Sequence, residues 1–178
     1  MRRRSILLAV AVLAAGLLVA SLAGASGGKT NLKADDLSGY QENPDVSTGA
    51  TGSFEATIDD DAQTITYELT YSGIEGGTVS AAHIHFGKRA VNGGVSAFLC
   101  SGGDKPACPA TAGTVTGVID AADIIGPVGQ GIGLGEFDEL VAAMRAGHTY
   151  ANVHSTGGNP AWPGGEIRAQ INDRDDNN

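Results

Sequence analysis

Histidines are the residues of this 178-residue chain that are best suited to chemistry. His83 and His85 are separated by one residue, so in a strand both imidazoles lie on the same face. Neutral imidazole is a common ligand of copper and zinc, and neighbouring same-face histidines can ligate one ion. The alternative is that both histidines are exposed or form hydrogen bonds without binding a metal. If only the H-x-H motif is considered, this alternative is favoured over a metal site.

His154 is the candidate for a third ligand. Strand alternation places Ala151 and Val153 on the buried face and leaves His154, Asn152 and Tyr150 on the opposite face. Three imidazoles would leave one coordination position open for water or a small ligand.

The fourth histidine, His148, has the same strand parity as His154 but precedes it by six residues. Six residues of extended strand span about 20 Å, too far for both to ligate one ion. His148 is therefore predicted to be a surface or strand-start residue.

Two charged residues follow a Pro-Gly-Gly turn on the polar face of the last expected strand, Glu166 and Arg168. They could orient a histidine or attract an anion, with Asn152 as a third candidate for such a supporting role. An exposed ion pair is the simpler interpretation. The sequence contains no serine–histidine–acid set with recognisable spacing, no phosphate loop and no His-Glu-x-x-His motif.

The two cysteines, Cys100 and Cys108, are expected to form a disulfide if the chain is exported. Closing so short a loop stabilises a fold by about 2.5 kcal/mol in the chain-entropy model. Their spacing is poor for metal binding, and no cysteine or methionine is placed to complete a blue-copper site.

The N-terminus has the order of a secretory signal peptide, expected at residues 1–25. Three arginines precede an apolar run over residues 6–20, and Ala23-Gly24-Ala25 fits a small-x-small cleavage site. An uncleaved membrane anchor is the alternative, because the apolar run approaches the ~20 residues that span a bilayer. Cleavage predicts a secreted, extracellular or periplasmic protein without membrane attachment.

Charge restricts the class of partner. The chain has 20 acidic and 11 basic residues, a net charge of −9. Nucleic-acid-binding surfaces need a surplus of lysine and arginine, so a nucleic-acid partner is excluded. We expect instead an extracellular protein or surface ligand.

Alternation of polar and apolar residues predicts a mainly β fold. Residues 53–58 and 64–71 alternate strictly and flank Asp59-Asp60-Asp61, which predicts a hairpin. Further strands are expected at about 33–40, 80–86, 95–100, 112–119, 148–154 and 165–171. Eight short strands separated by turn residues predict an antiparallel, Greek-key-like β-sandwich.

One short helix is expected at about residues 136–146. Phe137, Leu140, Val141 and Met144 fall at i, i+3, i+4 and i+7, which is one helical face, and Gly147 suits the position after the helix. The domain is expected over residues 35–171, with a flexible lead at 26–34 and an acidic tail at 172–178.

Five segments in fixed order resemble the CHRD domain family. They are LSGYQENP at residues 37–44, AHIHFG at 82–87, NGG at 92–94, YANVH at 150–154 and PGGEIRAQI at 163–171. From the first to the last they extend over about residues 35–171, which is nearly the whole chain after the expected signal peptide. The resemblance implies a secreted β-domain and little biochemistry.

A more distant likeness is to the copper/zinc superoxide dismutase sandwich. By that likeness His83, His85 and His154 would hold copper, and Arg168 would guide anions near the opening. No histidine lies between Phe86 and Thr111, so the zinc and bridging histidines of that family are missing. The likeness therefore leaves at most a copper-only site.

Three interpretations remain at this point. The sequence favours a non-enzymatic extracellular module, with copper or zinc binding as an additional property. The alternatives are a mononuclear copper or zinc oxidoreductase, and histidines that only hydrogen-bond across loops. A metal site requires the imidazole of His154 to lie within about 4 Å of the other two.

Overall fold

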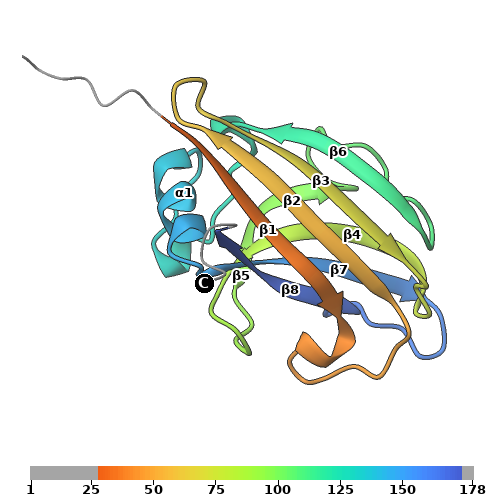
Figure 1. Ribbon diagram of the computed structural model, residues 1–178. Helices are drawn as coiled ribbons and strands as arrows, with labels where there is room; N and C mark the ends of the chain where they lie inside the picture. The colour runs from red at the N-terminus through yellow and green to blue at the C-terminus, as the bar shows by residue number, and fades with distance from the viewer. Residues whose placement is uncertain (1–27, 174–178) are drawn as a thin grey trace, which may run out of the picture.

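The computed structural model describes residues 28–173 and shows a mainly β fold (Figure 1). Eight antiparallel strands form one sheet in the order β5-β4-β7-β8-β1-β2-β3-β6. The sheet curls until residues of its two edge strands, β5 and β6, lie close together. The predicted eight-stranded antiparallel sandwich is therefore confirmed, in a nearly closed form.

The strands have the following bounds: β1 Lys29–Ser38, β2 Thr51–Asp59, β3 Thr64–Ser72, β4 Gly77–Phe86, β5 Gly94–Cys100, β6 Gly113–Ile119, β7 Thr149–Gly157 and β8 Ile167–Asp173. Within residues 28–173 the helices are η1 Gly39–Gln41, η2 Ala121–Asp123, η3 Val128–Gln130 and α1 Phe137–Arg145; α1 is an α-helix and the other three are 3₁₀-helices.

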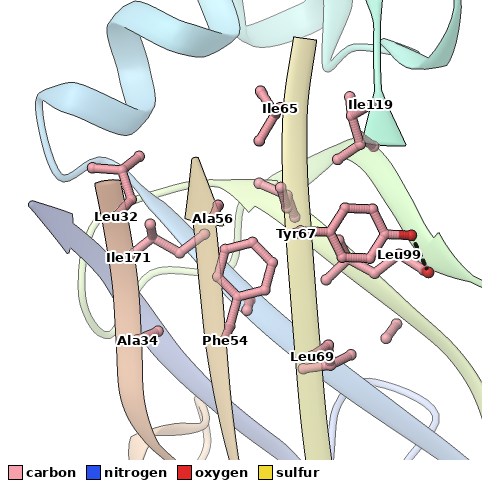
Figure 2. Close-up of a cluster of buried hydrophobic side chains, with 14 of the residues drawn as sticks. Leu32, Ala34, Phe54, Ala56, Ile65, Tyr67, Leu69, Leu99, Ile119 and Ile171 are labelled. Atoms are coloured by element: carbon pink, nitrogen blue, oxygen red, sulfur yellow. Dashed lines mark hydrogen bonds between the residues drawn. The ribbon is translucent and has the colours of Figure 1, made fainter. Parts of the chain in front are cut away.

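The hydrophobic core fills the space inside the curled sheet (Figure 2). In β3, Ile65, Tyr67 and Leu69 are buried while the residues between them are more exposed, as the alternation predicted. The hydroxyl of Tyr67 crosses the core and donates a hydrogen bond to the carbonyl of Leu99 at 2.7 Å. Burying each such large apolar side chain contributes about 1.5–3 kcal/mol.

The first strand corrects the sequence prediction. β1 begins at Lys29, four residues before the strand expected at about 33–40, so residues 29–32, expected to belong to a flexible lead, are strand. Lys29 pairs with Asp59 of β2, and Leu32 is fully buried. The strand was not predicted there because the segment contains polar residues such as Asn31, and an alternating pattern can be recognised only when several apolar residues are present. The expected signal peptide, residues 1–25, lies outside the described residues.

The predicted helix and disulfide are both confirmed. α1 buries Phe137, Leu140, Val141 and Met144, and Gly147 follows it with φ +68°. It lies at one end of the curled sheet (Figure 1). Cys100 at the end of β5 is bonded to Cys108. Within residues 28–173 no helix is both long and apolar enough to cross a membrane.

The outer face of β4, β7 and β8 is polar although most of it is buried. Alternate residues of these strands, such as Ile84, Val153 and Ile167, point into the core, which leaves the polar residues between them on the outer face. Three loops, residues 39–48, 87–93 and 158–165, contribute polar atoms that bond to this face. The candidate site lies under these loops.

Candidate metal centre

The structure brings three of the four histidines together. β4 pairs with β7 so that His83 is opposite Asn152 and Ala81 is opposite His154. The ring centroid of His83 lies 4.8 Å from that of His154 and 5.3 Å from that of His85. One ring nitrogen from each of the three side chains lies within 4.8 Å of the others.

Backbone carbonyls fix two of these rings. Nδ1 of His85 lies 3.0 Å from the carbonyl oxygen of Gly93, and Nδ1 of His154 lies 3.0 Å from that of Pro163. A carbonyl only accepts hydrogen bonds, so each Nδ1 carries the proton. Each Nε2 of a neutral ring then presents a lone pair. These two Nε2 atoms face one another at 3.4 Å.

Burial keeps the three imidazoles neutral. Desolvation, with smaller contributions from the neighbouring histidines, lowers the pKa of His83 to about 3. Desolvation also lowers the pKa of His85 to about 4, against the hydrogen bond to Gly93, and it lowers the pKa of His154. A proton shared between the two facing Nε2 atoms is therefore disfavoured near neutral pH.

The spacing of His85 and His154 fits a tetrahedral metal ion, whereas nitrogens of the three-histidine set reach 4.8 Å apart, more than the expected limit of about 4 Å, so that His83 has to move closer to bind the same ion. Metal–nitrogen bonds of about 2.0–2.1 Å place two tetrahedral ligands about 3.3–3.4 Å apart. The 3.4 Å between Nε2 of His85 and Nε2 of His154 has this value. His83 is only half-buried, and its Nδ1 has no hydrogen-bond partner.

Tyr150 and Arg168 support the ring of His85. The ring of Tyr150 stacks on the imidazole of His85, with centroids 4.9 Å apart and planes 8° apart. The guanidinium carbon of Arg168 lies 3.9 Å from the centre of the Tyr150 ring, a cation–π contact. The Tyr150 hydroxyl also accepts a hydrogen bond from the Gly93 amide at 3.0 Å. Sequence reasoning placed Tyr150 on the correct face but gave it no role.

The expected exposed ion pair of Glu166 and Arg168 is wrong. Both residues are buried, and no salt bridge joins them. Arg168 instead donates to the carbonyl of Val91 and the side chain of Asn92, both at 3.2 Å. The loop over β8 thus supplies the acceptors that solvent would supply at the surface. A guanidinium covered in this way favours the orienting role over the anion-guiding one.

Glu166 connects loops instead of contacting the histidines. Its Oε1 accepts hydrogen bonds from the Thr48 hydroxyl at 2.8 Å and the Glu75 amide at 2.7 Å, and its Oε2 accepts one from the Gly76 amide at 3.0 Å. These bonds hold the β1–β2 connection and the β3–β4 turn against the start of β8.

Sequence reasoning missed Glu42. It is 6% exposed, and its Oε1 has no hydrogen-bond partner. Burial raises its pKa to about 7, although Arg168 and the Asn43 amide act in the opposite direction. Its neighbour Asn152 is also buried with an unpartnered Oδ1. The polar segment around Glu42 resembles an exposed turn, so only its place in the family-like segment LSGYQENP indicated a special role.

His148 is exposed and directly precedes β7, outside the cluster, as predicted.

The comparison with protein families gives one match: the model of the CHRD domain matches residues 34–171, a range that contains every residue of the site. No curated protein and no solved structure matches the chain.

Proposed function

The chain belongs to the CHRD domain family, and we propose that it is an exported binding module that holds one metal ion through His83, His85 and His154. One observation carries the proposal. Two buried, neutral imidazoles, each with Nδ1 held by a backbone carbonyl, bring their unprotonated Nε2 atoms within 3.4 Å of one another. Lone pairs in this arrangement repel unless a cation lies between them, and burial disfavours a proton there.

Copper and zinc are the ions that suit this ligand set. All three ligands are neutral imidazoles, which bind borderline ions better than they bind calcium or magnesium. Ligating histidines commonly donate their second ring N–H to a backbone carbonyl, as His85 and His154 do here. The three rings would hold the ion, and Tyr150 with Arg168 would keep His85 in its orientation.

A module is favoured over an enzyme by how the site is enclosed. His85 and His154 are 7% and 8% exposed, which leaves half-buried His83 as the accessible side of the cluster. The nearby buried groups, Arg168 and Glu166, are engaged with loops. The disulfide and the family fit an extracellular protein, whose partner we propose to be an extracellular protein or surface ligand.

Thermal unfolding tests the metal site. The chelator-treated protein is melted alone and with zinc or copper(II) at about 100 times the dissociation constant. Binding at that excess contributes about 2.7 kcal/mol, a rise of about 5–10 °C for a domain of this size. We expect the rise to disappear in His154→Ala and to persist in the control His148→Ala, which changes the exposed histidine.

Two results would contradict the proposal. If neither metal raises the melting temperature of the unmodified protein, the three histidines hold no such ion. If His154→Ala shows the same rise as the unmodified protein, the metal binds elsewhere. A purely structural role predicts a third pattern, in which His154→Ala loses about 1 kcal/mol of stability in chelator and metal has no effect.

A further inference from the structure

His83 is positioned differently from the other two histidines. His85 and His154 are each fixed by a backbone carbonyl at Nδ1, whereas Nδ1 of His83 has no partner. The ring of His83 is held by aromatic packing. In addition to the two other imidazoles, it contacts Phe98, with centroids 4.7 Å apart and planes at 68°. The orientation of this ligand therefore depends on where the Phe98 ring lies.

Phe98 lies between His83 and the disulfide loop, residues 100–108. It is on β5, directly opposite His83 in the pairing with β4 and two residues before Cys100. The backbone of Gly102 packs against the phenyl ring so closely that a Cβ on Gly102 would lie 2.1 to 2.5 Å from three ring carbons. Only glycine allows the loop to press on the ring in this way.

The disulfide loop has a defined shape of its own. The Cys100–Cys108 bond closes it, and the Ser101 amide donates to the carbonyl of Pro106 at 2.8 Å. The ammonium of Lys105, on a side chain only 6% exposed, contacts Asp123 at 2.7 Å. The loop is thus anchored to the chain at η2 as well as to β5, and its contact with Phe98 is held in place.

We propose that the disulfide loop positions the third metal ligand: through Gly102 it presses the Phe98 ring onto His83 and directs that imidazole toward His85 and His154. The proposal rests on the proposed metal-binding function and adds how the site is kept ready for the ion. Without the phenyl contact, His83 can populate other rotamers, and metal binding must then order it. Losing a group that orients a ligand weakens metal binding by about 10–100-fold.

The first test uses Gly102→Ala, which displaces the Phe98 ring and leaves the disulfide intact. Gly129→Ala is the matched control, because a Cβ at Gly129 meets nothing within 4 Å. Zinc affinity is measured by competition with a chromophoric chelator. We expect affinity to fall about 10–100-fold for Gly102→Ala and to stay unchanged for Gly129→Ala. Unchanged zinc affinity in Gly102→Ala would overturn the proposal.

A second pair of variants tests the same contact independently. Phe98→Leu keeps an apolar side chain but removes the ring, and Cys100→Ala with Cys108→Ala opens the loop. Cobalt(II) is added as a probe, because its visible absorption is intense only in a tetrahedral site. We expect both variants to lose intensity at equal cobalt. Full intensity in Phe98→Leu would overturn the proposal even if the double cysteine variant fails to fold.

A measurement without metal separates this proposal from the proposed function. The ring ¹⁵N and ¹H resonances of the histidines are recorded by NMR in the metal-free protein and in Gly102→Ala. We expect those of His83 to shift or broaden while those of His85 and His154, fixed by carbonyls, stay in place. If the unmodified protein binds no zinc, the metal function fails, yet this experiment still tests the positioning. Equal changes at all three rings, or none at His83, would contradict it.

Discussion

At the scale of single residues, burial drives three histidines and one glutamate of the polar face toward their neutral forms. It lowers the pKa values of His83, His85 and His154 and raises that of Glu42. The two directions have one cause, because a low-dielectric site penalises whichever form is charged. The three proposed metal ligands are therefore neutral imidazoles, which do not have to lose a proton from the ring to coordinate an ion.

The first prediction concerns the pH dependence of metal binding. Protons compete with metal only near and below the pKa of a ligand, and those of His83 and His85 are about 3 and 4. Zinc affinity is therefore expected to change less than about threefold between pH 7.5 and 5.5. A site of exposed histidines, with pKa values near 6.5, would lose about tenfold per ligand for each unit below that value. Chelator competition at several pH values checks this, and a steep loss near pH 6 would contradict it.

The second prediction concerns Glu42. Its folded pKa of about 7 exceeds its ordinary value of 4.5, so between these values the folded state holds a proton that the unfolded state releases. Stability from this residue is thus lost as pH rises from about 4.5 to 7. Glu42→Gln keeps the shape without the charge and should be stabilising by up to about 3 kcal/mol at pH 8, with no gain at pH 4.

Urea unfolding at pH 4 and pH 8 measures this difference. Asp45→Asn is a suitable control, because Asp45 is an exposed carboxylate in the same loop. An equal effect of Glu42→Gln at both pH values would show that the folded protein does not suppress the ionisation of Glu42.

At the scale of elements, sequence patterns predicted the strands but not the loops that cover them. Alternation is a property of neighbouring residues, so it located β3 and placed His83, His85 and His154 on the outer face. The burial of Glu42 and Arg168 depends on loops that are far from them in sequence. A local sequence pattern does not show which distant loop will cover a residue. The sequence therefore suggested an exposed ion pair of Glu166 and Arg168, where the structure has a buried guanidinium.

The third prediction concerns the turn that leads into β8. Gly165 has φ +133°, and a Cβ there would lie 2.6 Å from Oε1 of Glu42 and 2.7 Å from the amide atoms of Asn152. Gly165→Ala is therefore expected to lose about 2–4 kcal/mol of stability, from backbone strain and displacement of the loop that carries Glu42. Gly164→Ala, where a Cβ meets nothing within 4 Å, should change stability little. Equal urea midpoints for the two variants would contradict this.

At the scale of the whole molecule, the site exists because β4, β7 and β8 are neighbours. His85 and His154 are 69 residues apart, and only the pairing of β4 with β7 brings them together. The order of the strands in the sheet depends on how the apolar faces of all the strands pack into one core. The sequence of a single segment does not contain this information. The face of the strand on which each histidine lies could be predicted from the sequence. That β4 and β7 pair with one another could not.

Glu166 is where this global arrangement can be tested. One carboxylate accepts three hydrogen bonds, from Thr48 and from the amides of Glu75 and Gly76, and so joins three distant parts of the chain. Glu166→Gln keeps the volume but replaces one acceptor oxygen by an N–H₂ donor that faces a donor.

A buried donor left without an acceptor costs about 1–3 kcal/mol, and the lost charge weakens the remaining bonds. We therefore expect Glu166→Gln to lower the free energy of unfolding by about 2–4 kcal/mol, while Glu68→Gln, at an exposed strand position, has little effect. Zinc affinity of the folded variant should match that of the unmodified protein, because His85 and His154 are held by the carbonyls of Gly93 and Pro163, to which the Glu166 side chain does not bond. A variant with full stability but weakened zinc binding would place Glu166 at the metal centre instead of at the junction of the loops.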